Sequence, residues 1–264
     1  MAVAEAGAGG AIALLRSVRG DPVRFGVAAA VVGTAVIAWA AVARLGGQGA
    51  MQPMGMEGGP EALAFVGLWT LGMVAMMFPI TLPTVFLYDH LLTTPARGER
   101  APELSRGHRL VGAPLFLGGY LSMYALLGAA GYALLAAGGA GATMTPALPA
   151  AVLVGAGLYQ ASPLKDRCFA AVHSPFAIFA RGWRPGLKGA FVMGARHGAV
   201  CVACCWALMA VMLVVGAMGL LWMAGLTVVL TLERSAGARG PQVSKVVAAG
   251  LIAAGVWVGA GLFA

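Results

Sequence analysis

A histidine and three cysteines stand close together in an apolar stretch of the chain, Gly194–Met209, which reads GARHGAVCVACCWALM. Imidazole and thiol groups bind soft and borderline metal ions, and thiols also carry out redox exchange. Three interpretations are open at this point: a metal site, a redox site, or core packing, because free cysteine and methionine are ordinary buried residues. The spacing of the side chains along a helix helps to separate these interpretations.

Helical geometry places the soft side chains of this stretch on one face. Each residue of an α-helix turns by about 100°, so Cys201 and Cys204 lie within about 40° of His197, and Cys205 lies about 80° from it. Arg196 lies about 100° to the other side, and we expect it to pair with a carbonyl or a carboxylate instead. The same face also includes two thioethers, those of Met193 and Met212.

This face is predicted to lie deep in a membrane. Counted from Lys188 at ~1.5 Å per residue, Cys201 to Cys205 are ~20 to 25 Å from the inner boundary, at or beyond the middle of a bilayer. A thiolate is costly at that depth, and a bound soft cation reverses the balance. Thiolate, thioether and imidazole ligands together favour Cu(I), with Zn(II) as the alternative. One helix supplies two or three ligands, so neighbouring segments must complete the site.

Three other groups of side chains extend the predicted metal pathway. One methionine trio forms a helix face just before Pro79, and another lies beside Glu57 in a Gly- and Pro-rich segment suited to capturing Cu(I). A further cysteine and His173 lie in a segment between spans, where either is a candidate receiving ligand. The predicted metal ligands are His197, Cys201, Cys204, Cys205, Met73, Met76, Met77, Met51, Met54, Met56 and Cys168.

The elements that position these residues are predicted to be membrane helices. The 264 residues are 60% hydrophobic and only 10% charged, with a mean hydropathy of +0.88. Several apolar runs reach the ~20 residues that cross a bilayer. We therefore expect one all-α domain over residues 1–264, a bundle of about seven transmembrane helices. Its expected spans are Phe25–Val42, Glu61–Tyr88, Ala113–Ala136, Ala147–Ser162, Gly189–Val215, Leu220–Leu232 and Val246–Phe263.

Two local features are expected beside the spans. Pro79 and Pro83 each remove a helical donor, so a kink or a break is predicted in the second span. A short amphipathic helix is predicted at about Ala170–Ala180, between the fourth and fifth spans.

The basic residues predict the orientation of the bundle. All of the 17 Lys and Arg residues except Arg44 and Arg196 fall before the first span or in alternate connections, on one side of the predicted bundle. The positive-inside rule makes that side cytoplasmic, with the N-terminus inside and the C-terminus outside. The net charge of +8 therefore reflects topology, and we expect no nucleic-acid partner. The predicted location is the inner or plasma membrane of a prokaryote.

Several segments together resemble a known family. These are WTLGMVAMMFPITLP, GLYQASPLKDRC, HGAVCVACCWALM, GAMGLLWMAGL and the later LER, which cover about Trp69 to Arg234. The chain resembles the uncharacterised family of predicted metal-binding integral membrane proteins, and the resemblance implies a metal site but no particular transport or enzymatic activity. Members of that family commonly carry a second cysteine four residues after Cys168, where this chain has Val172 beside His173.

Three functions are open on the sequence alone. The favoured hypothesis is a copper-binding membrane protein for transport, delivery or storage of Cu(I), acting with a membrane or periplasmic protein partner. The chain has no G-x-x-x-x-G-K-[ST] motif for ATP, and enzymatic activity is not expected. The alternatives are a membrane thiol redox enzyme that uses Cys201 and Cys204, and an accessory subunit of a larger membrane complex.

Overall fold

Helices make up nearly all of the part of the chain that the computed structural model describes, residues 21–46, 59–93, 106–143, 147–173, 184, 186–214 and 220–261. This confirms the all-α fold class, and each expected span falls largely within one helix. The helices are α2 (Pro22–Gly46), α3 (Gly59–Thr93), α4 (Arg106–Thr143), α5 (Ala147–Gln160), α6 (Pro163–His173), α8 (Gly186–Val214), α9 (Leu220–Ser235) and α10 (Gly240–Ala260), with a short 3₁₀ turn, η1 (Gly237–Arg239), before α10.

Five of these helices are long and apolar enough to cross a membrane: α2, α3, α4, α8 and α10. A sixth candidate is the pair α5 and α6, which meet at an angle of 64°. The remaining apolar helix, α9, has 16 residues and so a length of about 24 Å. The helices are thus compatible with membrane insertion, while the count of seven spans and the orientation stay predictions.

The two local expectations fare differently. The chain does not break at Pro79 or Pro83, because α3 continues through both prolines as one helix. A helix does follow the fourth expected span, but it begins at Pro163, earlier than expected, and ends at His173. Residues 174–180 of the expected amphipathic helix lie outside the described residues.

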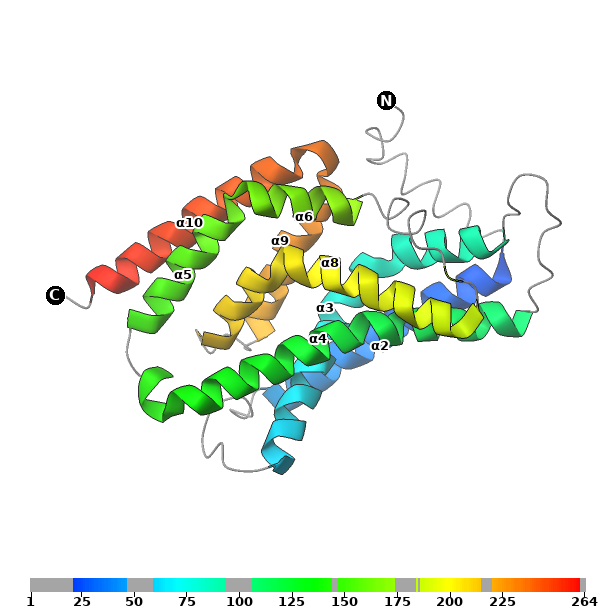
Figure 1. Ribbon diagram of the computed structural model, residues 1–264, viewed down its shortest axis with the longest axis horizontal. Coiled ribbons are helices and arrows are strands. Elements are labelled where there is room, and N and C mark those ends of the chain that lie inside the picture. Colours follow the sequence, from blue (N-terminus) through cyan, green and yellow to red (C-terminus); the bar gives the residue numbers. More distant parts are fainter. Residues whose placement is uncertain are drawn as a thin grey trace.

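Two long helices, α4 and α8, run closely against each other through the middle of the molecule (Figure 1). Glycines make this approach possible. A Cβ atom on Gly119 of α4 would overlap the carbonyl oxygen of Phe191, and one on Gly194 of α8 would overlap that of Phe116. Small residues at such crossings let two helix backbones pack directly, as membrane helices often do. The close packing holds the side chains of the two helices in a fixed register.

A second layer of helices lies beside this pair. α5 packs along α10, and α6 packs against α8 (Figure 1). Gly157 of α5 and Gly255 of α10 again lie where a Cβ would overlap the partner helix. α8 is therefore enclosed from two directions, by α4 on one side and by α5 and α6 on another.

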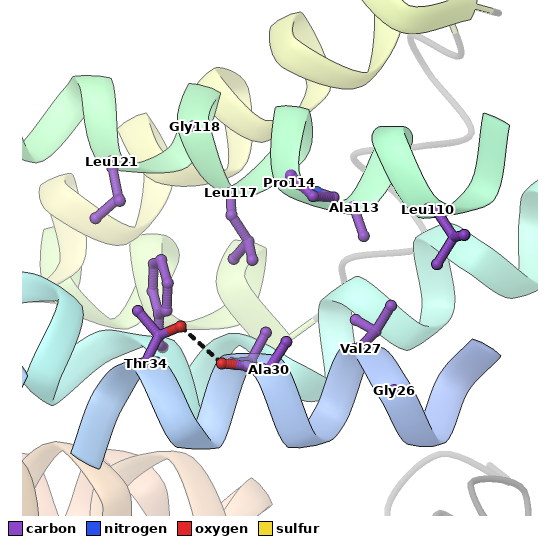
Figure 2. A pocket seen from close by; sticks show the side chains of 12 residues that line it. Gly26, Val27, Ala30, Thr34, Leu110, Ala113, Pro114, Leu117, Gly118 and Leu121 are labelled. Atoms are coloured by element: carbon purple, nitrogen blue, oxygen red, sulfur yellow. Dashed lines mark hydrogen bonds between the residues drawn. The ribbon is translucent and has the colours of Figure 1, made fainter. Parts of the chain in front are cut away.

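A large cavity lies between α2 and α4, with Phe78 of α3 at its wall (Figure 2). Its volume is about 400 Å³, and it is lined by small and aliphatic side chains. The polar side chain in its wall, Thr34, donates its hydroxyl to the carbonyl of Ala30 at 2.7 Å. Among the predicted metal ligands that the structure describes, none lines this cavity.

Candidate metal site

The structure brings two of the predicted ligand groups together. The methionine trio of α3 packs in one buried cluster with two cysteines of α8, and further methionines of α8 and α9 join them. All of these sulfur-bearing side chains are nearly inaccessible to solvent. We call this group the sulfur cluster: Met73, Met76, Met77, Cys201, Cys205, Met209, Met212 and Met223.

Two tyrosines of α4 hold the thiols of the sulfur cluster. The hydroxyl of Tyr120 donates to Sγ of Cys201 at 3.4 Å, and the hydroxyl of Tyr124 lies 3.6 Å from Sγ of Cys205. The two hydroxyls are 3.3 Å apart, so they form a continuous polar chain between the thiols. Because both tyrosines are fully buried, their hydroxyls place polar groups against the thiols inside a largely apolar core. The close crossing of α4 and α8 sets their position.

A cation also reaches the cluster. Nη1 of Arg234, from α9, lies 3.9 Å from Sγ of Cys201 and donates to it. A guanidinium and a tyrosine hydroxyl on one sulfur favour the negatively charged thiolate, which is the form that binds a metal. The sequence had placed Arg234 in a connection between spans, so this contact was not predicted.

A small cavity of about 30 Å³ opens beside the cysteines. That volume is sufficient for one water molecule or one metal ion. Both thiols of the sulfur cluster line it, as does the thioether-bearing side chain of Met77. The remaining lining residues are Ile80, Phe169, Val172, Cys204, Leu230, Glu233 and Arg234.

His197 lies one helical turn before Cys201 and is completely buried. Its ring stacks on those of Phe116 and Tyr120, with centroids 6.1 and 5.7 Å away. Neither ring nitrogen has a hydrogen-bond partner among the described residues. A buried polar group without a partner is costly, and such groups often mark the site of an ion or another ligand.

The predicted stripe on α8 is thus divided among three surroundings. Cys201, Cys205 and Met212 lie in the sulfur cluster, whereas Met193 packs in a separate core with Phe78 and Tyr88. Cys204 packs against Phe169 and Val172 of α6, beside Cys168. Within the described residues, no three His, Cys, Asp or Glu side chains are placed so that they could hold one metal ion. A site with three or more side-chain ligands from the described residues would therefore have to include thioethers.

Two further predictions concern Arg196 and the external methionines. Arg196 is exposed on α8, and no hydrogen bond or ion pair joins it to a carbonyl or a carboxylate in the described part of the chain. The external methionines Met51, Met54 and Met56 lie outside the described residues, as does the side chain of His173.

A buried charge network was also missed by sequence reasoning, which had assigned Lys165 to a connection between spans. Its ammonium group is fully buried and lies 2.9 Å from Oε2 of Glu233 on α9. Gln160 and Ser244 donate to Oε1 of the same carboxylate at 3.1 and 3.0 Å, and Gln160 also accepts from Lys165. The network joins α5, α6, α9 and α10. Since Glu233 precedes Arg234, it also fixes the position from which that guanidinium reaches Cys201.

Comparison with known proteins gives the family. The family model described as PpoB2, copper chaperone, matches residues 66–258, nearly three quarters of the chain. The chain belongs to this family. The matched region contains the sulfur cluster, His197, Cys168 and the whole charge network. Among curated proteins and among solved structures, no match was found.

Membership in a copper chaperone family agrees with the predicted resemblance to metal-binding proteins and supports copper as the metal. The sulfur ligands themselves also distinguish between copper and zinc. Thiolate and thioether sulfur atoms select Cu(I) among the common cellular metals, whereas zinc sites are usually built from cysteine, histidine and carboxylate. The sulfur cluster is rich in thioethers, so its composition fits Cu(I) better than Zn(II).

Proposed function

We propose that this protein is an integral membrane copper-binding protein that holds Cu(I) in the sulfur cluster and delivers it to a partner protein. The observation that carries the proposal is the burial of two thiols among the thioethers of α3, α8 and α9, in a chain of the copper chaperone family. Delivery is proposed in preference to transport because the family is described as a chaperone. The partner is a membrane or periplasmic protein that takes copper.

The proposed ligands are the thiolates of Cys201 and Cys205, completed by a thioether from the α3 trio. Met77 is the best placed of the trio, because it lines the small cavity together with both cysteines. His197 would supply an imidazole one turn away, where its nitrogens have no hydrogen-bond partner in the described part of the chain. Copper binding replaces the thiol protons, and the guanidinium of Arg234 offsets the negative charge that then remains on sulfur.

The proposed path begins outside the membrane. The external methionines Met51, Met54 and Met56 would capture Cu(I), and the thioether face of α3 would lead it inward to the cysteines. The proposed orientation places the N-terminus in the cytoplasm of a prokaryotic cell, with the chain in its inner or plasma membrane. Neutral thioethers suit such a path because they bind Cu(I) without requiring a buried charge.

Copper analysis of the purified protein tests the proposal. The full chain in detergent is loaded with Cu(I) in the presence of a chelator of known affinity, and the metal retained is measured. We expect the wild type to retain copper, and we expect the affinity of the sulfur cluster for Cu(I) to fall at least 100-fold in Cys201→Ser/Cys205→Ser. Ala210→Ser introduces the same hydroxyl elsewhere on α8 and should behave as wild type.

The methionines give a second comparison within the same experiment. Met77→Leu removes a sulfur while nearly conserving volume, so it should weaken Cu(I) binding without unfolding the protein. Met193→Leu is the matched control, since Met193 is as deeply buried on α8 but lies in a different core. A wild-type protein that retains no Cu(I) from the chelator would refute the proposed function.

A further inference from the structure

Cys204 is the one cysteine of α8 that lies outside the sulfur cluster. Its side chain points from α8 toward α6, where it packs with Phe169, Val172 and Cys168. Cys204 is 8% exposed, and Cys168 is the one cysteine of the four that is not buried. Two thiols from different helices therefore belong to one packed group between α8 and α6, and one of them, that of Cys168, is partly exposed.

A polar group accompanies these two thiols. The hydroxyl of Tyr159, on α5, donates to the backbone carbonyl of Ala203 and lies near both Cys168 and Cys204. This repeats the arrangement in the sulfur cluster, where tyrosine hydroxyls lie against Cys201 and Cys205.

One thiol of this second group, that of Cys204, also lines the small cavity. Cys201 and Cys205 line the same cavity, as do Phe169 and Val172 of α6. The cavity holds about 30 Å³, enough for one ion. An ion in it would therefore have the sulfur cluster on one side and the α6 side of Cys204 on the other.

We propose that Cys168 and Cys204 form a second Cu(I) site, from which a partner protein collects copper at the surface of α6. This inference rests on the proposed function and adds the point of release. Cu(I) is bound by two thiolates, which release their protons to the solvent, and the oxidation state of copper does not change. Two thiolates without further ligands leave a zinc ion short of its usual four, whereas thiolates bind the soft ion Cu(I). The partly exposed Cys168 gives an incoming thiol or thioether access to the metal.

The composition of the chain permits a direct test. It has four cysteines, so Cys201→Ser/Cys205→Ser leaves only Cys168 and Cys204. Dibromobimane becomes strongly fluorescent only when it bridges two neighbouring thiols, and we expect it to label this double variant. Adding Cys168→Ser, which leaves one thiol, should abolish the fluorescence. Prior addition of Cu(I) to the double variant should protect the pair from the reagent.

Copper stoichiometry completes the test. The full chain, titrated with Cu(I) against a competing chelator, should bind two ions, and each double variant, Cys201→Ser/Cys205→Ser or Cys168→Ser/Cys204→Ser, should bind one. Helical circular dichroism and elution volume verify that each variant is folded, and Cys204→Ala replaces Cys204→Ser where the hydroxyl perturbs packing.

The outcomes separate the two proposals. A wild-type protein that binds one ion, lost with Cys201 and Cys205, and a double variant that dibromobimane does not bridge would overturn the second site while leaving the proposed function intact. A wild-type protein that binds no Cu(I) would overturn both, whatever the bimane result. Bridging without protection by Cu(I) would show a thiol pair that is not a copper site, which also overturns this inference.

Discussion

The large and the small cavity of this molecule differ in the chemical groups of their walls. The large cavity, about 400 Å³ between α2 and α4, is bounded mainly by glycine, alanine and aliphatic side chains, with one threonine and one phenylalanine (Figure 2). The wall of the small cavity, about 30 Å³, contains three thiols, a thioether, a carboxylate and a guanidinium beside four apolar side chains. Size therefore does not locate the chemistry here. An apolar cavity between membrane helices does not require a particular placement of its lining side chains. A metal site made of sulfur ligands does, so it depends on helices that are held in fixed positions.

The walls of the small cavity are fixed from two directions. On one side α4 crosses α8 at glycines and presses two tyrosine hydroxyls against the thiols. On the other side the charge network ties α9 to α5, α6 and α10, and so sets Glu233 and Arg234 at the cavity wall. The large cavity has neither kind of support. If this contrast is correct, substitutions in either support should weaken Cu(I) binding at the thiols, and substitutions in the large cavity should not.

The largest effect is expected from Lys165→Met. It leaves the carboxylate of Glu233 buried without its cation, and breaking a buried ion pair in this way costs about 3–5 kcal/mol. The thermal midpoint of the purified protein should fall steeply, and Cu(I) affinity should fall with it because α9 loses its anchor. The control is Lys245→Met, at an exposed lysine of α10, which should leave the midpoint nearly unchanged.

A second variant distinguishes the effect of the unpaired charge on Glu233 from the effect of lost packing at Lys165. Lys165→Met/Glu233→Gln removes the uncompensated charge, so it should recover a large part of the stability that Lys165→Met loses. Equal midpoints for the single and the double variant would show that the network does not act through its charges.

Adjacent glycines of α4 give the next effect. Gly119 lies against the backbone of α8, so Gly119→Ala must push the helices apart, and such overpacking costs about 1–3 kcal/mol. Because Tyr120 and Tyr124 move with α4, Cu(I) binding should weaken as well. Gly118 lines the large cavity, where an added Cβ would meet no atom within 4 Å. Gly118→Ala should therefore keep both the thermal midpoint and the copper affinity. Comparable losses in the two variants would remove the distinction between the two faces of α4.

These supports mark the limit of what the sequence could predict. The helices follow from the lengths of apolar runs, and the methionine and cysteine faces follow from helical periodicity within single segments. The meeting of Met77 with Cys201 and Cys205 depends on which helices pack together, and residues of one segment do not determine that. One signal was available, because Gly194 and Gly198 form a G-x-x-x-G pattern that favours close helix crossing.

The charge network was harder to foresee. Lys165 and Glu233 lie in short polar motifs at the ends of helices, where the positive-inside rule treats basic residues as solvated. Burial reverses that interpretation, because a charge that is removed from water must find an opposite charge and hydrogen bonds. Tyr120 and Tyr124 gave no signal either, since aromatic residues in apolar helices are ordinary packing residues until a thiol is placed opposite them.

The smallest of the three effects concerns Arg234, whose guanidinium is the cation nearest to the thiol of Cys201 among the described residues. Arg234→Gln removes a positive charge beside the thiolate but keeps a long side chain and the neighbouring charge network. A long N–H to sulfur contact of 3.9 Å is weak, so we expect about a tenfold loss in Cu(I) affinity, equivalent to about 1.4 kcal/mol, with little change in thermal midpoint.

Arg239→Gln, at an exposed arginine of η1, is the matched control. Unchanged Cu(I) affinity in Arg234→Gln would mean that the tyrosine hydroxyls suffice to stabilise the metal-bound sulfur, and that α9 contributes only packing to the small cavity.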